Sequence, residues 1–324
     1  MSEDLEKTNT AYQTIEDIPG LGPATVNKLK EIGFKTIESL STATVAELVS
    51  AGIGEQVAEK VIEAARKSRA ITFVRGDELV ELRRNIRKLT TGCSSLDTLL
   101  QGGIETQSLT EFYGEFGSGK SQLCHQLCVT VQLGEAQGGL NGNVLYIDTE
   151  ATFRPERVQQ MAPRFGIKPK EVLKGIVYAE AYTSNHQTVL LENADEVIKE
   201  NNIKLIIIDS VMSHFRSEYI GREMLANRQQ QLNKHLHKLM RLSRAFNTAA
   251  VITNQVMASP DAFFSKAVSP VGGHILGHMS HNRIFLRKGR NNMRIAKLTA
   301  SPSLPEGEIP MRITERGIES DEDE

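Results

Sequence analysis

The segment Gly114–Ser121, which reads GEFGSGKS, constrains the fold more than any other part of the chain. An apolar run, Leu109–Tyr113, precedes it, and a helical pattern, Gln122–Leu133, follows it. Glycines at this spacing let successive backbone N–H groups point at one phosphate, while Lys120 reaches the β and γ oxygens and the Ser121 hydroxyl coordinates Mg²⁺. The strand–loop–helix context distinguishes a P-loop from a chance glycine-rich loop, so we expect a site for ATP and Mg²⁺ here.

Strand-like and helix-like patterns alternate from Leu89 onward. The apolar, β-rich runs are Ser108–Tyr113, Asn143–Asp148, Gly175–Ala181, Leu205–Asp209, Ala249–Thr253, Arg283–Arg287 and Arg294–Leu298. Helical patterns lie between most of the earlier runs, which predicts an α/β core with a mostly parallel twisted sheet covered by helices. The last runs are closely spaced, so we expect an antiparallel extension of the sheet.

Two acidic positions follow apolar strands other than the one before the P-loop. Leu205–Asp209 ends in a carboxylate, the Walker-B form that holds the Mg²⁺ shell. Glu150 lies just beyond Asn143–Asp148, where a carboxylate faces the ligand crevice of an open α/β sheet. We therefore expect Asp209 at the metal and Glu150 beside the attacking water. A helix N-cap is the alternative for Asp148 or Glu150.

Residues 14–67 read as all-helical. Two similar turns, Pro19–Pro23 and Ala51–Glu55, precede the helical stretches Ala24–Ile32 and Gln56–Lys67. This is a helix-hairpin-helix pattern, clearer in the first copy than in the second. Glycine at the turn lets the backbone approach a phosphate, and the following helix offers free N–H groups. Tight connections in a small helical bundle are the alternative, so direct DNA contact by these hairpins stays open.

The length and composition suit one large domain with a small companion, since the chain has 324 residues of which 40% are hydrophobic. The expected division is a helix-hairpin-helix domain over residues 1–67, a linker over 68–88, an ATP-binding α/β core over 89–318 and an acidic disordered tail over 319–324. No apolar run reaches the length of a membrane span, and MSEDLEKTNT lacks the build of a signal peptide. We expect a cytoplasmic, nucleoid-associated protein that does not contact membranes.

Cys124 and Cys128 flank His125, a grouping that invites a metal interpretation. Because they follow the P-loop and fall within its predicted helix, we favour packing as small apolar residues. Three cysteines cannot pair completely within one chain and fit a reducing compartment.

The net charge of −2 conceals two basic stretches. Arg216–Arg244 holds seven Lys or Arg against two acids, and Arg283–Lys297 holds six with no acid. A phosphate backbone meets local charge rather than total charge, so this distribution favours nucleic-acid binding.

With these residues in place, the chain resembles the RecA-like recombinases over nearly its whole length. The segments that carry the resemblance are Leu96-Asp97, Gly102–Glu105, the P-loop, Tyr146–Arg157, Phe215–Arg222, Thr253–Val256 and Gly272–His274. Any one of these segments is weak evidence, but their joint occurrence in this order is specific.

The resemblance implies roles at the nucleotide site. Glu150 positions the hydrolytic water, Arg157 stacks on adenine, and Gln255 senses the γ-phosphate. His278 senses the nucleotide across a subunit boundary, and a segment that includes Pro305 caps ATP from the adjacent subunit. The catalytic set is Glu150, Lys120 and Gln255. The expected nucleotide-binding set is Gly114, Glu115, Phe116, Gly117, Ser118, Gly119, Lys120, Ser121, Gln122, Arg157, Asp209, His278 and Pro305.

Two loops resemble the DNA-binding elements of the family. The first runs from about Arg216 to Arg228 and the second from about Val256 to Gly273. The expected DNA-binding residues are Arg216, Tyr219, Arg222, Arg228, Phe263, Phe264, Gly272 and Gly273. Arginines neutralise phosphates and apolar wedges part stacked bases, which suits binding without sequence preference. A solvated helix face is the alternative for the basic residues, and we assign Lys234, Lys238 and Arg241 to such a face.

Phe73 and Gly76 in the linker resemble the family's polymerisation motif, an aromatic anchor that inserts into the next subunit. A lone Phe in a polar linker needs an apolar cover, which a neighbour's pocket supplies. Packing of Phe73 against its own N-terminal domain is the alternative.

Three positions depart from the family pattern. Gly76 and Ala151 stand where the family commonly has Ala and Gly, respectively. Ala300 replaces an Asp that helps to hold a monovalent cation near the γ-phosphate, so we expect weak binding of K⁺. Glu306 and Glu308 are candidates to replace that carboxylate.

The resemblance implies a protein of DNA repair and homologous recombination. We expect a DNA-dependent ATPase that assembles with itself on single-stranded DNA, as a helical filament or ring, and pairs it with double-stranded DNA for strand exchange. Recombination mediators are possible further partners. The alternatives are a ring-shaped helicase motor with the same nucleotide residues and a regulatory paralogue without strand exchange of its own.

Overall fold

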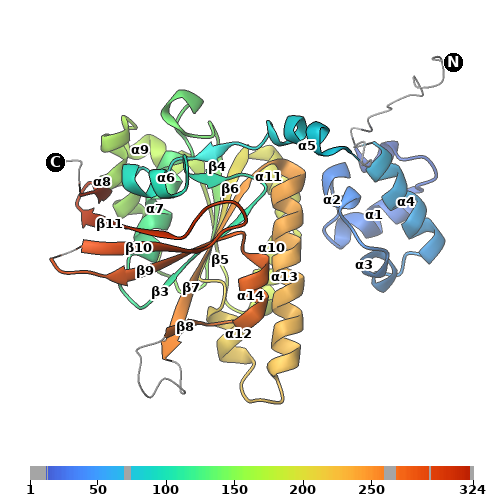
Figure 1. The fold of residues 1–324 in the computed structure, drawn as a ribbon. Helices are drawn as coiled ribbons and strands as arrows, with labels where there is room; N and C mark the ends of the chain where they lie inside the picture. The colour runs from blue at the N-terminus through green and yellow to red at the C-terminus, as the bar shows by residue number, and fades with distance from the viewer. Residues whose placement is uncertain (1–11, 13, 69–73, 259–267, 292, 322–324) are drawn as a thin grey trace. The chain divides into compact units, whose positions relative to one another are not determined.

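The structure is a computed structural model that describes residues 12, 14–68, 74–258, 268–291 and 293–321. The chain separates into two compact units, the first reaching to Asn85 and including Leu191–Lys199, the second comprising Ile86–Leu190 and the chain from Glu200 onward. Figure 1 shows the elements of both units in chain order.

The N-terminal part is all-helical, as predicted. Its helices are η1 (Ile15–Asp17), α1 (Pro23–Glu31), α2 (Ile37–Ser41), α3 (Val45–Ser50), α4 (Glu55–Lys67) and α5 (Gly76–Arg83). The two hairpin turns need glycine because Gly20 and Gly52 have φ of +85° and +80°. Lys28 Nζ donates to Gly52 O at 3.2 Å and so connects the two hairpins. The predicted linker contains a helix, α5, that leaves Leu79, Val80 and Leu82 about half exposed or more.

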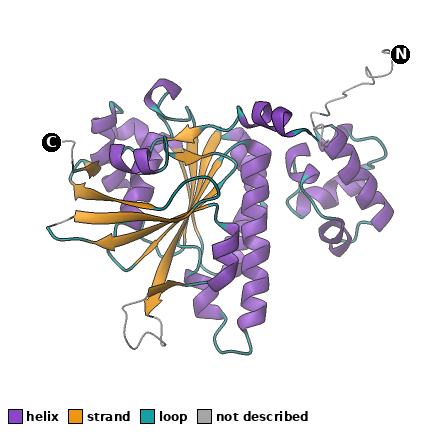
Figure 2. Ribbon diagram, viewed as in Figure 1, coloured by secondary structure: helices purple, strands orange, loops and turns teal. Residues whose placement is uncertain are grey.

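The second unit is built around a ten-stranded sheet in the order β12-β11-β10-β9-β3-β7-β6-β4-β5, with β8 paired to β7. Its strands are β3 (Leu109–Gly114), β4 (Asn143–Asp148), β5 (Ile176–Glu180), β6 (Ile203–Asp209), β7 (Ala249–Ala258), β8 (Val268–Pro270), β9 (Asn282–Lys288), β10 (Met293–Ala300), β11 (Gly307–Thr314) and β12 (Gly317–Ser320). The strands from β9 to β5 in this order pair in parallel, whereas β10, β11 and β12 extend the sheet antiparallel. The predicted sheet and its antiparallel extension are therefore confirmed (Figure 2).

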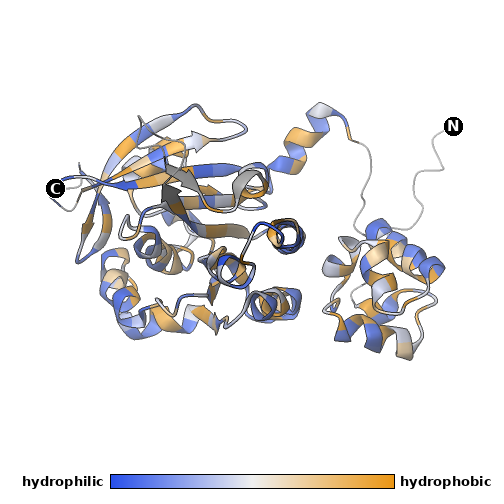
Figure 3. Ribbon diagram, turned by 90° about the horizontal axis from the view of Figure 1, so that it is seen from below, coloured by the Kyte–Doolittle hydropathy of each residue, from blue (hydrophilic) through white to orange (hydrophobic). Residues whose placement is uncertain are grey.

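Helices cover both faces of this sheet (Figure 1). The chain adds a small sheet, β1 (Lys88–Leu89) and β2 (Ile104–Glu105), and the helices α6 (Ser94–Leu99), α7 (Lys120–Thr130), η2 (Glu135–Gln137), α8 (Pro155–Met161), η3 (Ala162–Phe165), α9 (Pro169–Val172), η4 (Leu173–Gly175), α10 (Ser184–Glu192), α11 (Ala194–Glu200), α12 (Ser213–Glu218), α13 (Leu225–Phe246) and α14 (Gly273–Met279). α7 packs against β3 and β6 and contacts α8, whereas α13 packs against β7 and contacts α12 and α14. Hydrophobic and hydrophilic residues alternate around these helices in Figure 3, which is typical of helices that bury one side.

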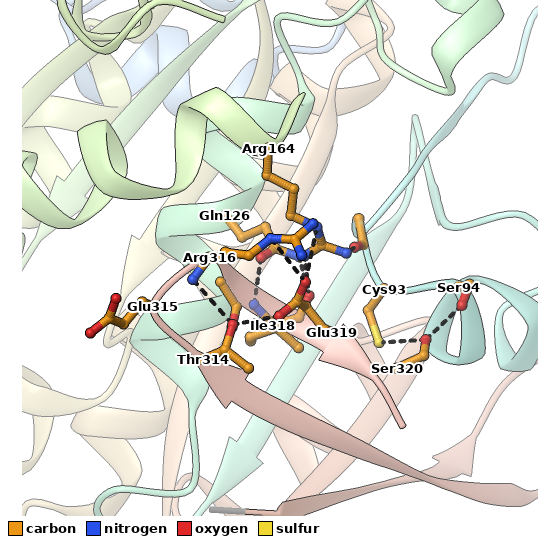
Figure 4. Close-up of polar contacts among 12 residues, drawn as sticks. Cys93, Ser94, Gln126, Arg164, Thr314, Glu315, Arg316, Ile318, Glu319 and Ser320 are labelled. Carbon is orange, nitrogen blue, oxygen red and sulfur yellow. Dashed lines mark hydrogen bonds and ion pairs between the residues drawn. The ribbon is translucent and has the colours of Figure 1, made fainter. Parts of the chain in front are cut away.

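The chain end differs from the expectation of a disordered tail from Glu319. Glu319 lies in β12, its carboxylate accepts the Thr314 hydroxyl at 2.5 Å, and it forms an ion pair with Arg164 at 3.5 Å. Ser320 is buried, and its hydroxyl oxygen accepts the Ser95 N–H at 2.8 Å. Figure 4 shows these contacts around β12. The run of acids at the chain end predicted mutual repulsion, but Arg164 neutralises Glu319, the first acid of the run.

Gln126 on α7 fastens the same strand from inside the core. Its Oε1 accepts the Ile318 N–H at 2.7 Å, and its Nε2 donates to Ile318 O at 3.0 Å and to Thr91 O at 2.8 Å (Figure 4). A fully buried amide with three partners fixes the strand next to the P-loop helix. Within the described ranges, the structure contains no helix that is long and apolar enough to span a membrane.

Candidate functional site

The P-loop connects the end of β3 to the start of α7. Gly117 and Gly119 have φ of +74° and +109°, which L side chains rarely adopt. A Cβ on Gly114 would lie 2.1 Å from Leu286 O, so this position also requires glycine. Glu115, Phe116 and Gly117 are exposed, whereas Ser118 and Gly119 are buried. The loop thus presents its tip to solvent while its base is fixed against β9.

Lys120 is the first residue of α7 and is only 9% exposed. Its Nζ donates to Gly114 O at 2.8 Å and to Glu115 O at 3.0 Å. Burial lowers the pKa of Lys120, while the carboxylates of Asp209 and Glu150 act in the opposite direction. The ammonium group is therefore held inside the loop, close to two acids.

Asp209 ends β6 with a side chain that two hydroxyls orient. Its Oδ2 accepts the Tyr146 hydroxyl at 2.8 Å, and its Oδ1 accepts the Thr253 hydroxyl. Burial and the Asp209 charge raise the pKa of Tyr146 well above its usual value, so the phenol stays protonated and donates. With Ser121 in the first turn of α7, this edge offers the carboxylate and hydroxyl oxygens that suit Mg²⁺.

A pocket of about 400 Å³ opens between these groups. Its lining residues are Phe116, Gly117, Gly119, Lys120, Ser121, Gln122, Glu150, Thr152, Asp209, Ser210, Gln255, Arg294 and Ile313. The predicted P-loop, metal and water-orienting residues therefore meet in one cavity. The Ser118 hydroxyl within the loop is buried without a partner among the described residues, which leaves a donor for an added acceptor such as a phosphate oxygen.

Glu150 and Gln255 come together across the pocket. Glu150 Oε1 accepts Ser210 Oγ–H at 2.8 Å and Gln255 Nε2–H at 3.1 Å. The alternative of a helix N-cap is wrong for both acids, because Arg154 is the N-cap of α8. The Asp148 carboxylate instead accepts the N–H groups of Glu150 and Phe153 in the loop, at 3.0 and 2.9 Å. Glu150 is thus an exposed carboxylate held in place by two side chains.

Arg157, the candidate adenine-stacking residue, lies on α8 beside the P-loop helix. Its Nε donates to Gln122 Oε1 at 2.8 Å, and its terminal nitrogens donate to Thr314 O and Glu315 O at 2.6 and 2.7 Å. These three acceptors fix the plane of the guanidinium next to Gln122.

Six predicted nucleotide-binding residues are not among these lining residues. Gly114, Glu115 and Ser118 belong to the P-loop itself, and Arg157 lies on α8. His278 is exposed on α14, and Pro305 is exposed in the connection between β10 and β11. Their expected action on the nucleotide of an adjacent subunit stays a prediction.

The predicted DNA-binding residues occupy three settings. Arg216 is exposed on α12, Tyr219 ends that helix, Arg222 is exposed in the following loop and Arg228 is half-buried on α13. Gly272 has φ of +99° before α14, and Gly273 begins that helix. Phe73, Phe263 and Phe264 lie outside the described residues. Gly76 begins α5 with open space around its Cα.

The assignment of Lys238 to solvent was wrong, because its side chain is only 8% exposed on α13. Long aliphatic stems of this kind pack along helices while the charged end finds a partner.

Sequence reasoning missed several residues that shape the site. Ser210, Tyr146 and Thr253 orient the two acids, while Arg294 and Ile313 line the pocket from β10 and β11. Ser210 directly follows Asp209, and this adjacency is the one sequence signal that could have indicated it. The other residues are far from Asp209 in the sequence. Ile220, 74% exposed in the first loop, was not singled out either.

Cys124, Cys128 and His125 lie on α7 with buried side chains, which agrees with the packing role favoured from the sequence. Burial lowers the pKa of His125 to about 4, and its Nε2 accepts the Arg154 N–H at 3.1 Å. The described residues contain no group of three potential metal ligands.

The P-loop at the end of β3, the acids at the ends of β4 and β6 and the parallel sheet behind them define a RecA-like recombinase core preceded by a helix-hairpin-helix domain. The chain belongs to the Rad51 family, whose profile matches residues 82–321. A SAM-like helix-hairpin-helix tandem matches residues 12–67. Over 323 residues the chain is 51% identical to the DNA repair and recombination protein RadA of Aeropyrum pernix, which covers 99% of this chain and 100% of that relative.

Ala151 generates a prediction about stability. It has φ of +53° in the loop that carries Glu150, a conformation that costs an L residue about 1 kcal/mol. We expect Ala151→Gly to raise the free energy of unfolding by about 0.5–1 kcal/mol, measured by urea denaturation, without a change in the pocket. Ala136→Gly, in the exposed 3-10 helix η2, is the control and should not stabilise the chain. An unchanged or lower free energy of unfolding in Ala151→Gly would contradict the inference that Ala151 is strained.

Proposed function

We propose that this chain is an ATP-dependent recombinase that assembles on single-stranded DNA and promotes homologous pairing and strand exchange with double-stranded DNA. The observation that carries the proposal is the contact of Glu150 with Gln255 at 3.1 Å. Gln255 lies at the start of the second candidate DNA loop, and Glu150 faces the nucleotide pocket. One hydrogen bond therefore joins the group proposed for hydrolysis to a segment proposed to bind DNA.

Within the proposed site, the loop N–H groups and Lys120 bind the phosphates of ATP, and Ser121 and Asp209 hold Mg²⁺. Bound Mg²⁺ supplies charge neutralisation on the β- and γ-phosphate oxygens. Glu150 orients and accepts a proton from water, Gln255 reports on the γ-phosphate, and Arg157 stacks on adenine.

We further propose that ATP lies between two copies of the chain. His278 and Pro305 are exposed and do not line the chain's own pocket, which suits contact with the nucleotide of a neighbour. The proposed division keeps residues 1–67 as the helix-hairpin-helix domain and 68–88 as the linker with Phe73 and Gly76 for polymerisation. It extends the core from 89–318 to Ser320, because β12 belongs to the core sheet. Recombination mediators are proposed further partners.

The competing helicase motor would form closed rings. A tandem helix-hairpin-helix domain before the core favours the recombinase instead. Electron microscopy of the full chain with single-stranded DNA and ATP separates the two, since a recombinase forms helical filaments. Strand exchange with Lys120→Ala as the negative control tests the activity itself.

The proposed role of Glu150 predicts that its loss reduces ATP hydrolysis but not ATP binding. Glu150→Gln keeps the side-chain shape but removes the base, so DNA-stimulated ATP hydrolysis should fall about 100-fold or more. The affinity for ATP, measured by equilibrium binding, should change little. Glu171→Gln, an exposed acid paired with Lys174, should leave both quantities unchanged. Retained hydrolysis in Glu150→Gln would exclude Glu150 as the base.

The first candidate DNA loop predicts a change in salt dependence. Arg222 is exposed, and if it neutralises one phosphate, Arg222→Ala should reduce the slope of log K against log salt for single-stranded DNA by about 0.7. Arg244→Ala removes an equally exposed charge in the last turn of α13 and is the matched control. Equal slopes for both variants, measured by titration at several salt concentrations, would remove Arg222 from the DNA site.

Ala300 predicts a weak response to monovalent cations. The nearby acids Glu306 and Glu308 already pair with Lys297 and Arg287 at 3.7 and 3.5 Å, which reduces their value as replacement ligands. We therefore expect ATP hydrolysis to proceed at similar rates in K⁺ and in Na⁺. Strong activation by K⁺ would contradict this expectation. Ala300→Asp restores the missing carboxylate and should therefore introduce activation by K⁺.

A further inference from the structure

Glu111 is a fully buried acid in the middle of the sheet, on β3. Its Oε2 accepts the Arg283 Nε–H at 2.7 Å, and its Oε1 accepts the Asn254 Nδ2–H at 2.9 Å. Arg283 lies directly opposite Glu111 in the β3–β9 register, and Asn254 lies on β7 at the other side of β3. The three residues therefore join three adjacent strands through one carboxylate.

On one side, this cluster holds the base of the second candidate DNA loop. Asn254 precedes Gln255, and its Nδ2 also donates to Val271 O at 2.6 Å. Val271 N in turn donates to Gln255 O at 3.0 Å. Asn254 thus fixes Val271, at the far end of the loop, to the strand that carries Gln255. A shift of either end of the loop must disturb the contact with Glu111.

On the other side, the cluster supports the segments proposed to act on a neighbour. Arg283 lies opposite Ala300 in the β9–β10 register, and Thr299 Oγ1 donates to Arg283 O at 3.0 Å. A Cβ on Gly277 would lie 3.4 Å from Arg283 Nη1, so α14 rests on the guanidinium one residue before His278. The same guanidinium lies 5.1 Å from the centre of the Tyr113 ring, which limits its orientation.

A buried ion pair contributes little to stability by itself, since apolar residues of similar size commonly stabilise a fold as well or better. The position of the Glu111–Arg283 pair between the two segments suggests a role other than stability. We infer that Glu111, Arg283 and Asn254 form a positioning network that couples the state of the DNA loop and Gln255 to α14 and the Ala300 segment. The inference rests on the proposed function and adds residues that touch neither nucleotide nor DNA.

The test compares ATP hydrolysis by the full chain with and without single-stranded DNA. Glu111→Gln preserves shape but weakens the hold on Arg283. We expect the DNA-stimulated part of the rate to fall about 10-fold, while the rate without DNA and the affinity for single-stranded DNA change less than about twofold. Glu171→Gln, which removes an exposed acid from its ion pair with Lys174 away from the proposed site, is the control and should keep DNA stimulation.

A purely structural role would reduce both rates in the same proportion, and that result, or unchanged stimulation, would overturn the inference. A wild-type chain without DNA-stimulated hydrolysis would contradict the proposed function itself, which is a different failure.

A second variant separates folding from coupling. Glu111→Gln with Arg283→Met removes both charges, so no buried charge is left without its partner. We expect the double variant to melt closer to the wild type than Glu111→Gln alone, yet still to lack DNA stimulation. Recovery of stimulation together with stability would show that the pair serves packing only and would overturn the inference.

Discussion

The parallel pairing of β3, β7, β6 and β4 is the constraint on which the site depends. In this register Gly114 lies opposite Gln255, and Asp148 lies opposite Asp209. Because parallel strands end at the same edge, the loops that follow them converge. The P-loop, the acid proposed to hold Mg²⁺ and Glu150 therefore come within one pocket. Residues separated by more than a hundred positions, such as Glu150 and Gln255, then form a direct hydrogen bond.

The same strands carry a second set of polar residues away from the pocket. Thr253 and Gln255 serve Asp209 and Glu150, while Asn254 between them faces Glu111, since side chains alternate along a strand. β7 therefore presents one face to the nucleotide site and the other to the buried ion pair. β7 therefore connects the nucleotide pocket to the Glu111–Arg283 ion pair, although Glu111 does not line the pocket.

Much of the core followed from local patterns. Continuous apolar runs predicted the buried parallel strands, and the spacing of the P-loop predicted the site around Lys120. β11 escaped prediction because Pro310 interrupts it, and a Pro is tolerated there since β12 pairs only with residues from Met311 onward. β12 escaped because acid-rich sequence favours solvent. Its partners, Arg164 and Gln126, are far away in the chain.

The sequence by itself determined the α/β core, the helix-hairpin-helix domain and the identity of the P-loop residues, because these depend on short-range spacing. It also determined the resemblance to the RecA-like recombinases, because several short segments occur together in one order along the chain. Tertiary structure decided which hydroxyls orient Asp209, which residues hold Glu150, and that Glu111, Asn254 and Arg283 meet. Such contacts depend on strand order and register, and β9, β3 and β7 are neighbours in the sheet but not in the chain. No local pattern encodes that adjacency, so only the folded sheet places one buried carboxylate between the two sides of the proposed site.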